Sequence, residues 1–199
     1  MLKWQTVAVV YTFLGSLAFA LAVGLRNGNP FVHPAPWLEL GSEARHGWSA
    51  LLGAALAVVV IVSSRFAVQR WRWASRLHTD LRPVAKNLGS VSIAIIAVFS
   101  GIAEEMFFRG FLAPLVGVVV QAVLFGVVHQ MRGPSRWVWV GWATLVGLGL
   151  GAIFALTGSL LGPTLAHSLV NGFNLAFLRD FDPDAKDRRL GGLLAPSDV

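Results

Sequence analysis

The sequence predicts an all-α fold: a polytopic bundle of about six transmembrane helices, with one further amphipathic helix lying at the membrane interface. Three observations predict it. Of the 199 residues, 55% are apolar and only 13% are charged, and the mean hydropathy is +0.66, which excludes an ordinary soluble domain. The apolar residues gather in runs of roughly the length that crosses a bilayer. Tryptophans stand at the edges of those runs, where indole rings prefer the headgroup layer.

Turn-forming residues separate the predicted spans. Lys3 is followed by about twenty apolar residues without a small-residue cleavage site, so the first run is a retained helix, with a signal peptide as the weaker alternative. Pro114 and Gly117 predict a tight turn, and Pro163 opens the last span because proline is tolerated in a first helical turn. The six predicted spans cover residues 6–25, 48–64, 88–113, 115–130, 137–156 and 163–178.

Residues 65–86 form a basic segment that differs from the spans. Phe66, Trp73, Leu77 and Leu81 recur at helical spacing among arginines. This pattern predicts a helix lying in the membrane interface, and a solvated basic loop is the alternative.

The segments assemble into one helical membrane domain, residues 1–178. Residues 179–199 are charged and contain a Gly-Gly pair and a proline, which predicts a flexible tail.

The distribution of basic residues predicts the orientation. The net charge is +6, but the basic residues lie beside apolar segments, which excludes a nucleic-acid partner and favours the lipid bilayer. In a six-span arrangement, Arg26 and Arg45 lie on one side, Arg109 lies within a span, and every other lysine and arginine lies on the opposite side. The positive-inside rule then predicts a multi-pass protein of the bacterial inner membrane with both termini in the cytoplasm.

Ionisable side chains interrupt the third span. Charged groups at membrane depth are costly, so they indicate a functional site. Glu105 and Arg109 are four residues apart on one helical face, which predicts an ion pair that makes their burial tolerable. Glu104 points about 100° away from that face and stays free for chemistry. The sequence contains no cysteine, which excludes disulfides, thiolate metal sites and a cysteine nucleophile.

Two later spans carry polar residues at helical spacing. Phe125 and His129 lie one turn apart, as do His167 and Asn171, and Asn174 extends the second face. Taken singly, such residues are more often structural hydrogen-bonding groups between helices. The helical rise, however, places His129, His167 and Asn171 at depths that tilt can bring level with the glutamates. We therefore expect Glu104 and these three side chains to line one cavity.

These motifs resemble those of the membrane-bound CAAX prenyl protease type II and bacteriocin-processing family, also called CPBP or Abi. The family pattern is Glu-Glu-x-x-x-Arg, then Phe-x-x-x-His, then His-x-x-x-Asn or Asp. All three occur here in that order, each on a predicted span, and the resemblance covers residues 95–177. It implies an intramembrane glutamic endopeptidase that cuts a membrane-anchored protein or peptide and uses neither a cofactor nor a metal.

The resemblance also implies residue roles. Glu104 is the general base that activates water, and His129 helps to hold that water. His167 and Asn171 donate hydrogen bonds to the developing oxyanion. The supporting residues, which fix the geometry around this set, are Glu105, Arg109, Phe125 and Asn174.

Two other functions remain open at this stage. Two carboxylates and two histidines are also a possible ligand set for a zinc-dependent membrane protease, although the sequence has no His-Glu-x-x-His helix. A non-catalytic membrane protein is the second alternative, either an immunity or scaffold partner or a proton-coupled transporter.

Overall fold

Helices make up the regular structure of the computed structural model, which describes residues 4–26 and 28–185. Within these residues the only β-type pairing is an isolated bridge between Val32 and Ser159, so the predicted all-α fold is confirmed. The helices in chain order are α1 (Trp4–Arg26), α2 (Ser42–Arg70), α3 (Arg72–Ala85), α4 (Ser90–Glu105), the π-helix η1 (Met106–Leu112), α5 (Ala113–Val128), α6 (Arg136–Thr157) and α7 (Leu161–Asp180).

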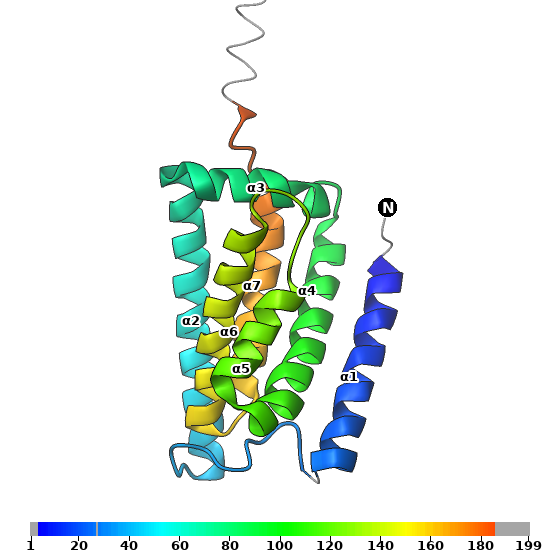
Figure 1. The fold of residues 1–199 in the computed structure, drawn as a ribbon, viewed down its shortest axis with the longest axis vertical. Helices are drawn as coiled ribbons and strands as arrows, with labels where there is room; N and C mark the ends of the chain where they lie inside the picture. Colours follow the sequence, from blue (N-terminus) through cyan, green and yellow to red (C-terminus); the bar gives the residue numbers. More distant parts are fainter. Residues whose placement is uncertain (1–3, 27, 186–199) are drawn as a thin grey trace, which may run out of the picture.

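The long helices run between two ends of the molecule, and α3 lies across one of these ends (Figure 1). Helix α7 is central, since α2 and α4 both pack along it, while α5 packs along α6. Helix α1 stands at the edge of the bundle (Figure 1), against α4 and η1. The start of α1, the end of α7 and α3 share one end of the molecule, and the segment joining α1 to α2 lies at the other.

In the part of the chain that the structure describes, four stretches of helix are long and apolar enough to cross a membrane: Gln5–Arg26, Ser42–Arg70, Ser90–Val128 and Arg136–Thr157. The predicted count of about six is therefore not confirmed. The third stretch contains two predicted spans, because α4, η1 and α5 follow one another without a break. Helix α7 is not among the four. It is 20 residues long, but its polar residues lower its hydropathy.

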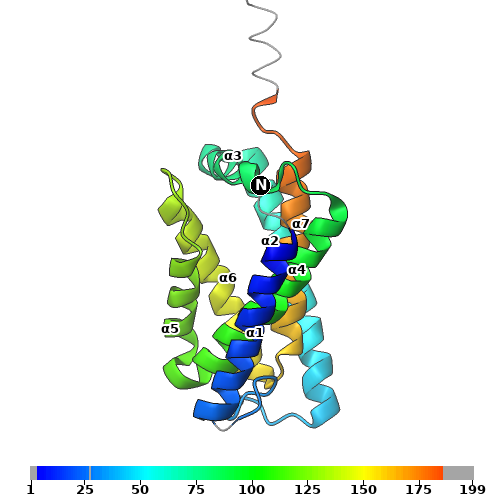
Figure 2. The same cartoon turned by 90° about the vertical axis from the view of Figure 1, so that its right-hand side faces the viewer.

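The chain reverses its direction near the start of α5. Gly117 has φ +84° and ψ 163°, a conformation that interrupts the helix and that L residues with a side chain rarely adopt. After this kink, α5 returns beside α6 (Figure 2). The turn predicted at Pro114 and Gly117 is thus present, and it brings His129 at the end of α5 back to the depth of the glutamates.

Helices α2 and α7 approach each other through small residues. A Cβ atom added at Gly53 or Gly162 would overlap the backbone of the facing helix. Ser49 Oγ donates a hydrogen bond to the Ser159 carbonyl at 2.9 Å and accepts one from the Gly162 N–H, also at 2.9 Å. Small residues that let backbones meet are typical of membrane helix pairs, so Gly162 serves packing within the protein.

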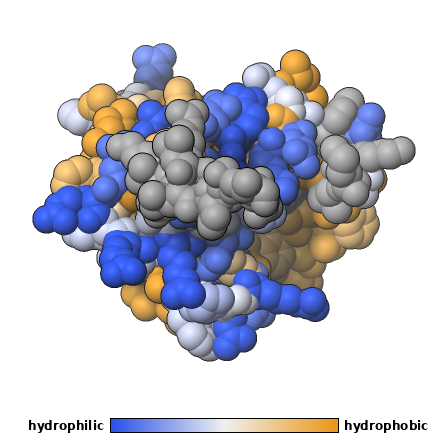
Figure 3. Space-filling model, turned by 90° about the horizontal axis from the view of Figure 1, so that it is seen from above, coloured by the Kyte–Doolittle hydropathy of each residue, from blue (hydrophilic) through white to orange (hydrophobic). Residues whose placement is uncertain are grey.

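The predicted interfacial helix is shorter than residues 65–86. Residues 65–70 continue α2, because only the extended Trp71 (φ −124°, ψ 130°) breaks the helix. Helix α3 buries Ala74, Leu77 and His78 against the bundle. Seen from this end, the surface is largely hydrophilic with apolar side chains around its rim, which suits a helix lying at a membrane surface (Figure 3).

Polar contacts hold α3 to its neighbours at this end. Ser135 Oγ donates to Asp80 Oδ2 at 2.6 Å, and Arg82 lies 3.1 Å from Asp182. The His78 imidazole lies 3.0 Å from the Phe181 carbonyl. Of the predicted flexible tail, residues 179 and 180 end α7, and residues 186–199 lie outside the described part of the chain.

Candidate active site

The two glutamates occupy the last two positions of α4, directly before the π-helix. The Arg109 side chain on η1 donates to Glu105 Oε1 at 2.7 Å, and both side chains are fully buried. Arg109 also donates to the Gly147 carbonyl at 3.1 Å and stacks over the Phe125 ring, 4.4 Å from its centroid. The predicted ion pair is confirmed, and π-helices are frequent at functional sites.

Glu104 meets histidines from two other helices. His129 Nε2, at the end of α5, lies 3.3 Å from Glu104 Oε2, and His167 Nε2 on α7 lies 3.9 Å from the same oxygen. Glu104 Oε2 is buried and accepts no hydrogen bond of good geometry from the described residues. The convergence of Glu104, His129 and His167 that the motifs predict is therefore present.

The Nδ1 atoms of both histidines already have hydrogen-bond partners. His129 Nδ1 lies 2.7 Å from the Phe125 carbonyl, and His167 Nδ1 lies 2.7 Å from Glu105 Oε1. A carbonyl only accepts hydrogen bonds, as does a carboxylate paired with arginine, so Nδ1 carries the proton in both rings. In the neutral rings, each Nε2 then presents a lone pair toward Glu104 Oε2. Three acceptors face one point, an arrangement that favours a shared proton or a water molecule there.

Phe125 forms the apolar wall between these groups. Its ring lies 4.2 Å from the His129 ring and 5.7 Å from the His167 ring, measured between centroids. It also packs against Arg109. Phe125, predicted to support the site, thus contacts three of its residues: His129, His167 and Arg109.

Asn171 and Asn174 differ in their hydrogen bonding. Asn171 Nδ2 donates to Ser100 Oγ on α4 at 2.9 Å, which uses one of its two N–H groups. Asn174 Oδ1 is buried and has no hydrogen-bond partner among the described residues. Both asparagines line a cavity of about 180 Å³ together with His129 and His167.

Glu104 does not line this cavity, contrary to the prediction that four residues would share it. Helix α4, which carries Glu104, is packed between α1 and α7. A molecule in the cavity therefore contacts His129, His167 and Asn171, and the Glu104 carboxylate is adjacent to both histidines through its Oε2 atom.

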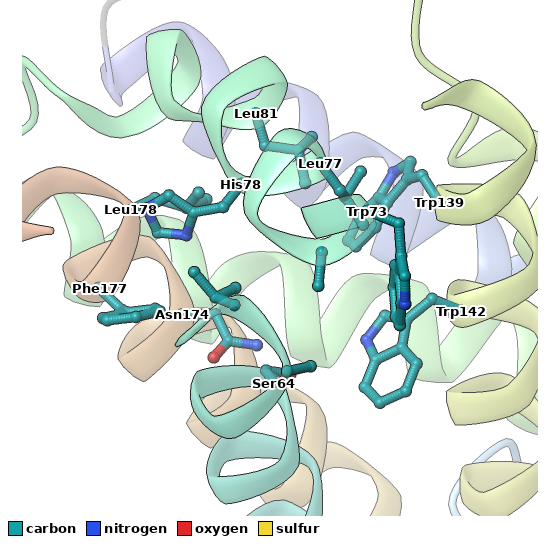
Figure 4. A pocket seen from close by; sticks show the side chains of 13 residues that line it. Ser64, Trp73, Leu77, His78, Leu81, Trp139, Trp142, Asn174, Phe177 and Leu178 are labelled. Carbon is teal, nitrogen blue, oxygen red and sulfur yellow. The ribbon is translucent and has the colours of Figure 1, made fainter. Parts of the chain in front are cut away.

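A second cavity of about 100 Å³ adjoins the first beneath α3. Aromatic and aliphatic side chains from α2, α3, α6 and α7 surround it (Figure 4). Leu81, Trp139, Trp142, Asn174 and Leu178 line both cavities.

Two residues of the site lie outside the predicted motifs. Tyr11, on α1, interacts with the Glu104 carboxylate through its hydroxyl group. Ser100 receives the hydrogen bond from Asn171. Tyr11 is the only tyrosine in the sequence and lies within an apolar run, which marks it as unusual but does not identify its partner.

The site offers no evident metal-ligand cluster. Among residues 4–26 and 28–185, no three histidine, aspartate or glutamate side chains form a group that could hold a metal ion.

Comparisons with known proteins agree with the motifs. Residues 86–173 match the family model described as type II CAAX prenyl endopeptidase Rce1-like, and this segment contains all three motifs. The uncharacterized protein YpbD of Bacillus subtilis (strain 168) is 29% identical over 122 residues, which are 60% of this chain and 63% of YpbD. The chain therefore spans less than two thirds of the length of that relative. No solved structure matches the chain.

Proposed function

We propose that this chain, whose residues 86–173 match the type II CAAX prenyl endopeptidase Rce1-like model, is an intramembrane peptidase of the glutamic type and belongs to that family. The observation that carries the proposal is the meeting of Glu104 with His129 and His167, at 3.3 and 3.9 Å, from three separate helices. Buried ionisable groups are rare within membrane proteins unless they serve a function.

In the proposed reaction, water lies against Glu104 Oε2 and the Nε2 atoms of His129 and His167. It donates one proton to Glu104 Oε2 and the other to one of the two nitrogens, which orients the water and leaves a lone pair of its oxygen for attack. Glu104 takes the proton as the oxygen bonds to the carbonyl carbon of the peptide. That proton then passes to the nitrogen of the leaving amine, and the C–N bond breaks.

The hydrogen-bond pattern refines the oxyanion role implied by the family resemblance. Asn171 has a second N–H group besides the one given to Ser100. His167 donates from Nε2 only as an imidazolium, because its Nδ1 proton is held by Glu105. Asn171 is thus the constant donor to the oxyanion, and His167 joins it when protonated.

The substrate in this proposal is a membrane-anchored protein or peptide whose chain reaches the cavity in front of the histidines. In this proposal the protein lies in the bacterial inner membrane with α3 and both termini on the cytoplasmic side. The basic end of the molecule supports this orientation, since α3 and the end of α7 lie together there (Figure 1).

Glu104→Gln tests the function, because glutamine keeps the shape of the side chain and cannot take a proton. In cells that express either form, we expect membrane-protein termini produced by the wild type to disappear in Glu104→Gln. Glu43→Gln, an exposed glutamate on α2, is the matched control and should behave as wild type. The same termini in both forms would refute the peptidase proposal and favour a non-catalytic membrane protein. Loss of the termini upon treatment of isolated membranes with a chelator would favour the zinc alternative.

A further inference from the structure

We propose that the cavity beneath α3 is a subsite for a bulky apolar side chain of the peptide substrate, and that the Asn174 amide holds the substrate backbone beside it. The inference rests on the proposed peptidase function and adds a specificity site to it.

The two cavities form one path from the catalytic histidines to α3. The larger one includes His129, His167 and Asn171 in its lining. Five residues line it and the smaller cavity together: Leu81, Trp139, Trp142, Asn174 and Leu178. A chain bound at the histidines can therefore continue along α7 toward α3 without leaving the protein.

Asn174 is the one polar residue common to both cavities. Its Oδ1 atom is buried without a hydrogen-bond partner in the described structure. A buried acceptor that stays unpaired costs free energy, so such an atom at the junction of two cavities indicates a bound donor. The backbone N–H of a peptide lying along α7 is a donor of the required kind.

The spacing along α7 gives the position of this contact in the substrate. Asn174 lies seven residues after His167, which is about 10 Å along a helix. An extended peptide rises about 3.3 Å per residue. The backbone held by Asn174 is therefore about three residues from the cleaved bond, and the neighbouring side chain enters the cavity beneath α3.

The lining of that cavity determines what enters it. Trp73, Trp142 and Phe177 present aromatic surfaces to it (Figure 4). His78, at its edge, is occupied by the Phe181 carbonyl. None of the residues that line this cavity is an aspartate, glutamate, lysine or arginine. A charged side chain would be left there without a partner, whereas an apolar one gains burial.

The test uses the full chain in vesicles of phosphatidylethanolamine and phosphatidylglycerol. The probe is a pool of synthetic peptides with an N-terminal palmitoyl anchor and randomised positions, and products are identified by mass spectrometry. For the wild type we expect Trp, Phe or Leu to be enriched at one position about three residues from the cleaved bond. Ala67→Phe fills the cavity and should shift that position to Ala and Gly only. Ala20→Phe, on the exposed face of α1, is the control and should leave it unchanged.

Asn174 is tested with a single peptide from the pool that the wild type cleaves. Asn174→Leu should raise KM about tenfold with kcat within twofold, the effect of one lost hydrogen bond. Asn174→Asp keeps an acceptor oxygen and should restore KM. Asn87→Leu, which makes the same substitution at an exposed asparagine after α3, should leave KM unchanged.

The outcomes separate the two proposals. Cleavage that needs Glu104 but shows no preference at any position, or a preference unaffected by Ala67→Phe, overturns the subsite and leaves the peptidase. If Ala67→Phe fails to fold, Trp142→Ala removes a wall of the cavity, and an unchanged preference in that variant overturns the subsite equally. Absence of any Glu104-dependent cleavage overturns both proposals.

Discussion

Replacing Arg109 by leucine tests the central role of the buried ion pair. Arg109 and Glu105 are both fully buried, 2.7 Å apart. Arg109→Leu leaves the Glu105 carboxylate buried without its positive partner, and also removes the hydrogen bond to the Gly147 carbonyl. His167 then depends on a carboxylate whose charge is uncompensated.

The expected loss of stability is large. Removing one partner of a buried ion pair costs about 3–5 kcal/mol, because the remaining charge is stranded. For a chain of this size, 1 kcal/mol corresponds to roughly 2–4 °C in Tm. Arg109→Leu should therefore lower Tm by roughly 6–20 °C. In Arg109→Leu combined with Glu105→Leu, both charges are gone, and most of the lost stability should return.

Thermal unfolding in detergent, followed by tryptophan fluorescence, measures the stability, and peptide cleavage measures the activity. The double variant should stay inactive although it is stable, because His167 has lost the acceptor that fixes its ring. Arg72→Leu, which makes the same substitution at an exposed arginine of α3, is the control and should not shift Tm. A Tm for Arg109→Leu within 2 °C of wild type, or a double variant no more stable than the single one, would show that this pair does not organise the site.

Two further predictions concern residues outside the three motifs. Tyr11→Phe removes the hydroxyl that interacts with Glu104 and should lower kcat about tenfold or more, the effect of one hydrogen bond to a charged group. Thr12→Val, which alters the neighbouring residue of α1, is the control and should leave kcat unchanged. Equal kcat values in the wild type and both variants would exclude Tyr11 from the site. Burial lowers the pKa of His78 below its ordinary value of 6.5, against the opposing effect of its hydrogen bond, so folding disfavours the charged ring. The contribution of His78 to stability is therefore fully present above about pH 6.5 and falls as the pH decreases below it. Urea unfolding should show a smaller decrease of the free energy of unfolding over this pH range in His78→Gln than in the wild type.

The sequence was sufficient for the elements and motifs whose signals are local. Helical periodicity predicted that Glu105 and Arg109 share a face, and the ion pair is present. The turn at Gly117 followed from the residue type, because glycine tolerates a positive φ. The meeting of Glu104, His129 and His167 followed from the depth of each motif within its span. None of these inferences required knowledge of which helices are neighbours.

Contacts between helices that no motif marks were beyond the sequence. Tyr11 reaches Glu104 only because α1 packs against α4, and nothing in the local pattern of α1 identifies that neighbour. The start of α3 was misplaced for a related reason. From their charge, Arg65 and Arg70 are assigned to the basic interfacial helix. They belong instead to the end of α2, which stops only at the extended Trp71, where the chain turns so that α3 can pack across the bundle.

Helix α7 combines the length of a membrane span with polar residues that lower its hydropathy. Helix α7 is as long as a transmembrane helix but is absent from the stretches that qualify by hydropathy, since it contains His167, Asn171 and Asn174. Such a helix is stable in a bilayer only where its neighbours satisfy those groups. The neighbours do so for His167 through Glu105 and for Asn171 through Ser100. Asn174 Oδ1 is the exception, since it has no hydrogen-bond partner within residues 4–26 and 28–185. Because it lies beside a cavity, it is the group on α7 that a bound peptide would complete.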